Sequence, residues 1–306
     1  MRIGTLLLLA LPVVSLAELW AHRQFRQAAP TQGDWQRLEG ELAAVRRPRD
    51  LVTVVPHWAD PLLRQQLGDK AFPIDILARA DDDSLERVVV VSFDHAHEQR
   101  FEQWKERERR TSGPFLIRAL DNPHLEIPRM RLIERVAPQW LSVTEGPTGD
   151  PHVCTYTTTA RATAGNLPGE PTFGPRRFAC PSGEPYLVTV TTIDDEQFAP
   201  RRCIWAHPSP IGPITLKFRD VWLGEKLVGH AGLPWLLSRD GAGTPIHLAA
   251  EFEGRPIGHV VVEDTQGFTR FEWSTTAHRD QRGDLELVVS SAESRNRRFC
   301  FTLESR

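Results

Sequence analysis

Alternating apolar and polar residues are the feature that most constrains the fold of this chain. Residues 214–219 have the sequence ITLKFR, and residues 246–253 and 285–289 repeat the alternation. Successive side chains of a strand point to opposite faces, so these segments are typical of strands with one buried face. Turns that contain glycine separate them. The pattern predicts an antiparallel β-sandwich of roughly eight strands over residues 151–306, a size typical of jelly-roll domains.

The N-terminal half follows a different pattern. Short apolar runs predict strands, and apolar residues that recur every three to four positions predict helices. The predicted strands are residues 51–55, 88–93 and 115–120. The predicted helices are residues 35–45, 60–68 and 98–110. Strands that alternate with helices predict a small α/β three-layer domain over residues 31–122, with some parallel pairing. Because no glycine-rich loop follows a strand, we assign no nucleotide and no other cofactor.

The chain as a whole is therefore predicted to be an α+β two-domain protein, in agreement with its length of 306 residues. Residues 123–150 are punctuated by prolines and are predicted to be a linker that holds a strand or two against the neighbouring domain. The net charge of −3, from 37 basic and 40 acidic residues, creates no basic field and argues against nucleic acid as a partner.

The N-terminus has the pattern of an export signal. One arginine precedes an apolar run that extends from Ile3 to Ala17, and Ser15-Leu16-Ala17 supplies small residues at a cleavage position. Residues 1–17 are therefore predicted to be a signal peptide. Residues 3–21 are also long enough to remain as a membrane anchor, which is the alternative. Either outcome predicts an extracytoplasmic protein, periplasmic or secreted.

Four cysteines allow three pairings. In a terminal strand, Phe299 and Phe301 share one face and Cys300 points to the other. If Ile204 faces inward with these two rings, Cys203 and Cys300 both face outward and can form a disulfide across neighbouring strands.

The remaining pair, Cys154 and Cys180, would then close the loop that precedes the sandwich. The alternative is four unrelated buried thiols. Zinc is disfavoured, because no two cysteines have the close spacing of a structural metal site.

Two resemblances to known families accompany these patterns. FRDVWLGEKLVGHAGL, TPIHLAAEFEGRPIGHVVVED, GFTRFEWSTTA and GDLELVVSS resemble successive strands of galactose-binding-like and related carbohydrate-binding β-sandwich domains, over residues 203–303. The resemblance implies glycan binding, but it assigns no calcium-ligating or sugar-binding residue of that family to a position of this sequence. DLVTVVPHWADPLL and LIRALDNP resemble the extracytoplasmic portions of lipid-linked sugar glycosyltransferases, which implies work on cell-envelope glycans.

Four residues of the sandwich are the candidate ligand-binding residues: Trp222, His230, Trp235 and Arg239. An indole face matches the C–H face of a sugar ring, and a histidine or arginine can bond its hydroxyl groups. The alternative is that the tryptophans belong to the core. Trp205, next to Cys203, is predicted to shield the disulfide.

Other polar clusters have simpler interpretations. Residues 94–98, DHAHE, could hold a metal, but the pattern is more typical of a polar helix start, and we assign no metal. Asp81-Asp82-Asp83-Ser84 is predicted to be a helix cap. Asp150 and His152 are predicted to form a turn that leads into a strand.

The function predicted from these features is that of an exported, non-catalytic glycan-binding or cell-envelope assembly accessory. Its partner would be a carbohydrate or envelope glycan. One alternative is an envelope hydrolase or transferase that uses His57, Asp94 or His152 at a site between the domains. Another is an interaction scaffold for a membrane enzyme.

Overall fold

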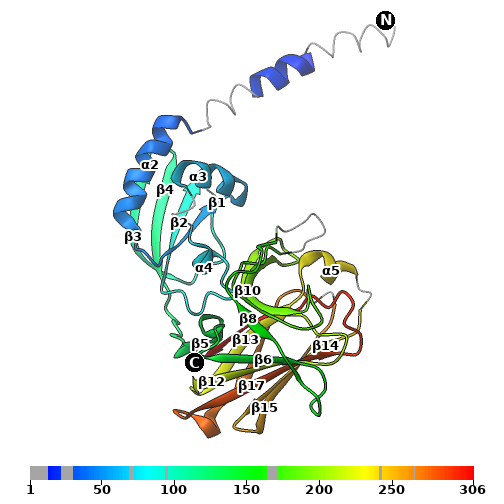
Figure 1. The fold of residues 1–306 in the computed structure, drawn as a ribbon. Helices are drawn as coiled ribbons and strands as arrows, with labels where there is room; N and C mark the ends of the chain where they lie inside the picture. Colours follow the sequence, from blue (N-terminus) through cyan, green and yellow to red (C-terminus); the bar gives the residue numbers. More distant parts are fainter. Residues whose placement is uncertain are drawn as a thin grey trace, which may run out of the picture. The chain divides into compact units, whose positions relative to one another are not determined.

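The computed structural model describes residues 13–21, 30–68, 72–93, 96–163, 171–240, 243–264 and 266–306. The chain divides into two compact units (Figure 1). Unit 1 consists of Met1–Phe72 and Arg87–Pro123, and unit 2 consists of Pro73–Glu86 and His124–Arg306.

The predicted signal peptide or anchor falls mostly on residues 1–12, which lie outside the described residues. Residues 13–21 form a helix in which the side chains of residues 13–20 are exposed. Within the described ranges, every helix is too short or too polar to cross a membrane.

Unit 1 is built on a four-stranded sheet with the order β1-β2-β4-β3. The predicted parallel pairing is confirmed, because β1 (Leu51–Val55) runs parallel to β2 (Arg87–Phe93). The other two pairings are antiparallel and add β4 (Phe115–Asp121) and β3 (Lys105–Ser112).

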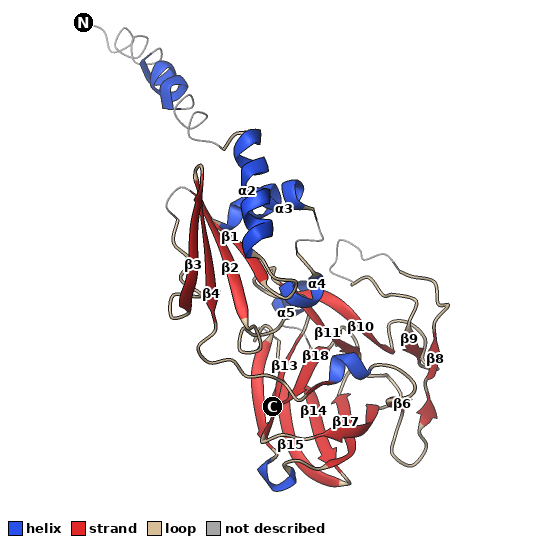
Figure 2. Cartoon of the chain, turned by 90° about the vertical axis from the view of Figure 1, so that its left-hand side faces the viewer, coloured by secondary structure: helices blue, strands red, loops and turns tan. Residues whose placement is uncertain are grey.

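Two helices cover one face of this sheet (Figure 2). Helix α2 (Gln32–Val45) begins with a capping box between Thr31 and Asp34, and the 3₁₀ turn η1 (His57–Ala59) leads into α3 (Asp60–Leu67). Their apolar side chains pack with those of alternate strand residues in one core. Since α2 and α3 share one face, the described residues establish two layers, and the predicted third layer is not confirmed.

The predicted helix over residues 98–110 is wrong, because residues 105–112 form strand β3. The segment KERERR is rich in helix formers, but pairing with β4 decides its conformation. As the edge strand, β3 carries charges that pair locally, such as Arg109 with Glu106 at 2.8 Å and Arg107 with Asp121 at 2.5 Å. Charged side chains protect an exposed sheet edge from pairing with other chains.

Unit 2 contains two sheets whose strands pair antiparallel throughout. In spatial order the first sheet comprises β16 (Thr269–Ser274), β13 (Lys226–Gly232), β18 (Cys300–Ser305), β11 (Pro200–Ala206), β10 (Leu187–Asp194), β9 (Arg177–Ala179) and β8 (Thr155–Thr157), with β5 (Met130–Arg131) paired to β18. The second sheet comprises β15 (Arg255–Val262), β14 (Ile246–Phe252), β17 (Arg282–Ser291), β12 (Ile214–Trp222), β6 (Leu141–Glu145) and β7 (His152–Val153). Among the described residues, unit 2 also contains the short elements η3 (Leu132–Arg135), α4 (Ile74–Leu77), α5 (Trp235–Asp240) and η4 (Thr276–His278).

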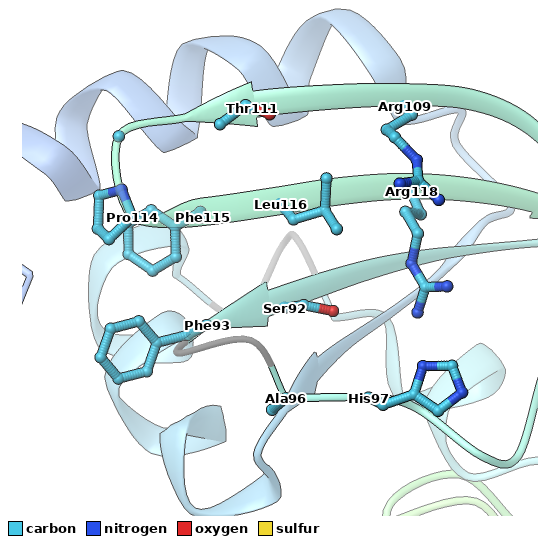
Figure 3. A pocket seen from close by; sticks show the side chains of 11 residues that line it. Ser92, Phe93, Ala96, His97, Arg109, Thr111, Pro114, Phe115, Leu116 and Arg118 are labelled. Carbon is cyan, nitrogen blue, oxygen red and sulfur yellow. The ribbon is translucent and has the colours of Figure 1, made fainter.

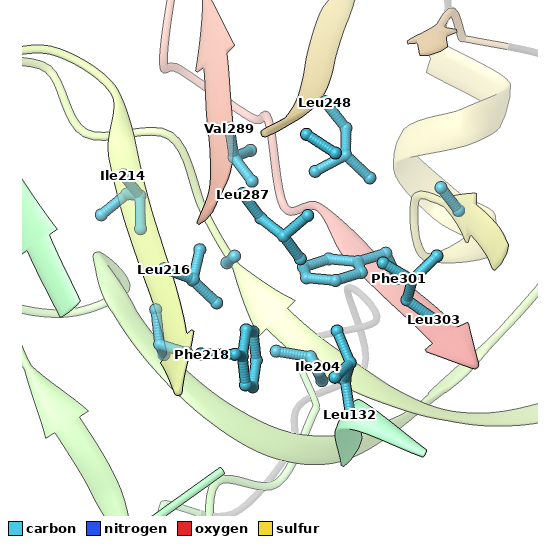
Figure 4. Packing of buried hydrophobic residues seen from close by; sticks show 14 of the residues in the cluster. Leu132, Ile204, Ile214, Leu216, Phe218, Leu248, Leu287, Val289, Phe301 and Leu303 are labelled. Atoms are coloured by element: carbon cyan, nitrogen blue, oxygen red, sulfur yellow. The ribbon is translucent and has the colours of Figure 1, made fainter. Parts of the chain in front are cut away.

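The two sheets pack face to face as a β-sandwich. Leu216, Leu248 and Leu287 of the second sheet share one core with Ile204 and Phe301 of the first (Figure 4). All five side chains are buried. The β-sandwich predicted from the alternating pattern is therefore confirmed, and this large apolar core is its main source of stability.

Residues 123–150, predicted as a linker, are part of this sandwich. Strand β6 pairs with β12, and the core includes Leu132, Leu141 and Val143. The prolines separate short elements here rather than ending the domain. Asp150 and His152 lie in the predicted turn into a strand, where the Asp150 amide donates to the Pro147 carbonyl before β7 begins.

Both predicted disulfides are present, Cys203–Cys300 and Cys154–Cys180. Strands β11 and β18 pair with Ile204 opposite Phe301. The rings of Phe301 and of Phe299, which precedes β18, lie in the core, and both cysteines lie on the other face. That face is covered, because Trp205 packs with Cys203 and Cys300 in a second apolar cluster. The prediction that Trp205 shields the disulfide is confirmed.

Candidate functional site

Two aromatic rings and a guanidinium form an exposed cluster in unit 2. The rings of Phe198 and Trp235 have centroids 5.2 Å apart, and Arg239 Cζ lies 5.4 Å and 5.5 Å from those two centroids. Phe198 is 58% exposed, Arg239 is exposed and Trp235 is half-buried. We call these three residues the aromatic platform.

Phe198 lies in the tight turn that joins β10 to β11. Its φ is +57°, a conformation that a bulky residue rarely adopts. The buried Asp195 holds the turn, because its carboxylate accepts hydrogen bonds from the amides of Gln197 and Ala199, both at 2.9 Å, and from Arg201 Nε. The exposed ring is therefore presented by a preorganised backbone.

Trp235 and Arg239 come from the short helix α5, which follows Pro234. The hydroxyl of the buried Ser238 donates to Glu196 Oε1 in the β10–β11 turn. This hydrogen bond ties α5 to the turn that carries Phe198. The two segments that carry the platform are therefore joined, and the Glu196 carboxylate lies between them.

This arrangement can bind a ring that has one apolar face and polar edges. Aromatic faces offer flat apolar contact, Arg239 supplies hydrogen-bond donors, and Glu196 supplies an acceptor. A pyranose ring has both properties, with C–H groups on its faces and hydroxyl groups on its rim.

The four predicted ligand-binding residues do not form one site. Trp235 and Arg239 belong to the platform, but Trp222 lies at the end of β12 in the other sheet. Its half-buried ring is flanked by two guanidinium groups, with Arg129 Cζ at 5.0 Å and Arg282 Cζ at 5.3 Å from the ring centroid. Trp222 therefore has its own arginine neighbours and is not part of the platform.

His230 is buried in a different environment. Its ring stacks on Phe268 at 6.3 Å, and its Nε2 lies 3.9 Å from Asp81 Oδ2, which is too long for a hydrogen bond. Asp81 instead accepts two hydrogen bonds from Arg306. Burial, with nearby cations such as Arg270, lowers the pKa of His230 to about 4. The imidazole is therefore neutral at pH 7, despite its proximity to Asp81.

The predicted helix cap at Asp81-Asp82-Asp83-Ser84 is wrong, because these residues form a turn. Asp81 and Asp83 accept hydrogen bonds from the buried Arg306 side chain, which Glu126 and Glu304 also contact. These carboxylates raise the pKa of Arg306, although burial alone would lower it. The cluster is an internal ion-pair network of unit 2.

The residues proposed for an alternative catalytic site are distributed over both units. His57 of unit 1 has its Nε2 4.0 Å from Glu98 Oε2, and His152 belongs to β7 of unit 2. Asp94 and His95 lie outside the described residues. His97 Nε2 lies 3.6 Å from Glu102 Oε1. Within the described ranges, His, Cys, Asp and Glu side chains form no group of three that could hold a metal ion.

Unit 1 contains a hollow of about 630 Å³ (Figure 3). Its lining includes Ser92, Arg109 and Arg118. These strand residues alternate with Val91 and Ile117, which point to the helix-covered face, so the hollow lies on the opposite face of the sheet. Sequence reasoning missed this hollow, because its residues come from three strands and a loop.

Comparisons with known proteins identify no family. No family model matches the chain, and no curated protein matches it. A solved structure of the CBM51-2 and INT domains of ZmpB from Clostridium perfringens, in complex with GlcNAc, is similar to 54% of this chain at 13% identity and a TM-score of 0.29. The chain covers only 37% of that structure.

Two further solved structures are similar at the same low level. The CBM51 domain of a Clostridium perfringens GH95 protein, in complex with methyl-galactose, matches 47% of this chain and 90% of its own, at 12% identity and a TM-score of 0.27. The enzymatically active domain of tailspike protein 4 from bacteriophage CBA120 matches 38% of this chain and 17% of its own, at 15% identity and a TM-score of 0.20.

TM-scores this low carry no argument, so the description of unit 2 as a β-sandwich rests on its own strand pairings. The resemblance of the N-terminal half to glycosyltransferases finds no support in these three matches.

Proposed function

We propose that unit 2 binds carbohydrate at the aromatic platform of Phe198, Trp235 and Arg239. The observation that carries the proposal is the exposed Phe198 ring, held at positive φ by a turn that the buried Asp195 organises. Strained backbone that presents an exposed aromatic side chain is typical of functional sites. The neighbouring indole and guanidinium extend the surface to the size of a sugar ring.

We further propose that the protein acts outside the cytoplasm as a non-catalytic accessory in cell-envelope assembly, with a jelly-roll-like sandwich as its binding unit. Two disulfides support an oxidising compartment such as the periplasm or the exterior. The apolar N-terminal run supports export, with residues 3–21 as a membrane tether or residues 1–17 as a cleaved signal.

Trp222 and His230 are no longer the best candidates for direct sugar contact. Trp222 belongs to the other sheet of unit 2, and His230 is buried with its ring stacked on that of Phe268. We assign the contact to Trp235 and Arg239, and we add Phe198.

A glycan array tests the proposal. The full chain is screened beside Trp235→Ala and Phe198→Ala, and each variant should lose at least tenfold in affinity for any glycan that the native chain binds. The matched control is Trp140→Ala, because Trp140 is another half-buried indole of unit 2 with a guanidinium, that of Arg135, at 3.9 Å. This control should bind like the native chain.

Two other outcomes would replace the proposal. Trp and Arg are also enriched at protein interfaces. If no glycan on the array binds the chain, and crosslinking in intact cells joins the platform to a membrane protein, the scaffold function applies. If the chain processes glycans and His57→Ala or His152→Ala abolishes this activity, the hydrolase or transferase function applies.

A further inference from the structure

We propose that the hollow in unit 1 is a binding site for a small organic anion. Arg118 and Ser92 would bind the anionic group, which is a carboxylate or a phosphate. An apolar wall that includes Ala96, Pro114 and Leu116 would contact the rest of the molecule. The site is independent of the carbohydrate platform, which belongs to unit 2.

The sheet brings the polar side chains together. Arg118 of β4 lies opposite Arg109 of β3, and Ser92 of β2 lies opposite Leu116 of β4. In Figure 3 the Ser92 hydroxyl, the Arg118 guanidinium and the His97 ring are directed toward the same part of the hollow. Three strands and the loop after β2 thus contribute to one site.

Two of these groups have buried atoms without partners. Ser92 is almost fully buried, and neither its Oγ nor the Arg118 Nε has a hydrogen-bond partner within the part of the chain that the structure describes. Leaving a buried polar group unpaired costs about 1–3 kcal/mol, so such groups usually have a water or ligand as partner. Both atoms belong to residues that line the hollow.

The local charge favours an anion. Arg109 is already paired, because Glu106 accepts two hydrogen bonds from its guanidinium at 2.8 Å and 2.9 Å. That hydrogen bonding lowers the pKa of Glu106, and the more distant Arg118 contributes to the same shift. Among the described residues that line the hollow, none is acidic. Among the described residues that line the hollow, Arg118 is therefore the guanidinium that remains for a ligand to pair with.

The size of the hollow favours an organic anion over a simple ion. A volume of about 630 Å³ falls within the usual range for small-molecule sites. A water molecule fills only about 30 Å³. The guanidinium fork matches carboxylate and phosphate oxygens in a bidentate geometry, while the apolar wall removes hydrocarbon surface from water.

Calorimetric titration of the full chain tests this site with four probes. Phenyl phosphate and benzoate carry the two candidate anionic groups on an apolar ring, benzyl alcohol is the neutral analogue, and inorganic phosphate lacks the ring. We expect at least one of the two aromatic anions to bind, at least tenfold more tightly than benzyl alcohol and inorganic phosphate. The aromatic anion that binds more tightly shows whether the site prefers a carboxylate or a phosphate.

The variants separate recognition from folding. Arg118→Gln should weaken binding at least tenfold. Arg118→Lys should lose less affinity, because the positive charge remains while the bidentate guanidinium is lost. Ser92→Ala should weaken binding several-fold. Arg107→Gln is the matched control, because it removes the same charge from an exposed position of β3. It should leave the affinity unchanged.

Three results would overturn the proposal: no binding of either aromatic anion, equal binding of benzyl alcohol, or unchanged affinity in a folded Arg118→Gln or Arg118→Lys variant. Equal affinity for inorganic phosphate would overturn the role given to the apolar wall. Since Arg118 is remote in sequence and unit from Trp235, these results leave the carbohydrate proposal untouched, and failure of the glycan array leaves this one untouched.

Discussion

Removing the two disulfides separately should destabilise unit 2 by different amounts. The Cys203–Cys300 pair joins residues 97 positions apart, and the Cys154–Cys180 pair joins residues 26 positions apart. In the chain-entropy estimate, a cross-link stabilises by restricting the unfolded chain, and the effect grows with the logarithm of the loop length. The longer loop corresponds to about 4.7 kcal/mol and the shorter to about 3.5 kcal/mol.

Packing does not cancel this difference. All four cysteines are buried, so either double replacement by alanine also leaves a small cavity. From the loop lengths we expect Cys203→Ala with Cys300→Ala to cost at least about 1 kcal/mol more than the double replacement of the other pair.

The assay is guanidinium unfolding of the three proteins, followed by tryptophan fluorescence and by far-ultraviolet circular dichroism. The free energy of unfolding comes from the linear dependence on denaturant. If the Cys154–Cys180 replacement costs as much as the other, or if removing Cys203–Cys300 costs under about 1 kcal/mol, the loop-closure reasoning is wrong.

Three further predictions follow from buried polar groups. The pKa values of His207 and His230 are both lowered to about 4, chiefly by burial, from an ordinary value of 6.5. Between pH 6.5 and about 4, only the unfolded chain binds these protons. The free energy of unfolding should therefore fall as the pH is lowered through this range, by up to about 1.4 kcal/mol per pH unit for each histidine. Urea unfolding at a series of pH values should show this slope, and His230→Asn should reduce it. Arg306→Met should cost about 2 kcal/mol in the same assay, because the half-buried carboxylates of Asp81, Asp83, Glu126 and Glu304 lose the guanidinium that they share, although Arg270, Lys226 and Arg131 remain beside three of them; a cost near zero would contradict the ion-pair network. Asp195→Ala should lower carbohydrate affinity at least fivefold without removing any sugar contact, because the turn that presents Phe198 loses its carboxylate; unchanged affinity in calorimetry would show that the turn needs no such support.

Local periodicity predicted much of the sandwich. The alternation around Ile204, Phe299 and Phe301 indicates which side chains face the core, and the same alternation correctly assigned Cys203 and Cys300 to the opposite face. Strand alternation is dictated by backbone geometry, so such inferences depend only on neighbouring residues.

Predictions failed where distant residues decide the outcome. The charges of residues 105–110 favour a helix locally, but pairing with β4 makes them an edge strand. Trp222 is the last residue of β12, and Arg129 and Arg282 lie against its ring from positions remote in the sequence, which its neighbours in the sequence do not indicate. Phe198 gave only a weak signal, a single aromatic residue in a short turn between two alternating segments.

The most direct test of the central claim is nuclear magnetic resonance of the indole N–H groups during titration with a glycan identified on the array. The chain contains nine tryptophans, which gives at most nine resolvable indole signals. Binding at the platform predicts that the Trp235 signal shifts with saturation while those of Trp140 and Trp222 stay in place. A saturable shift at Trp222 without one at Trp235, or the absence of any glycan that shifts Trp235, would contradict the account.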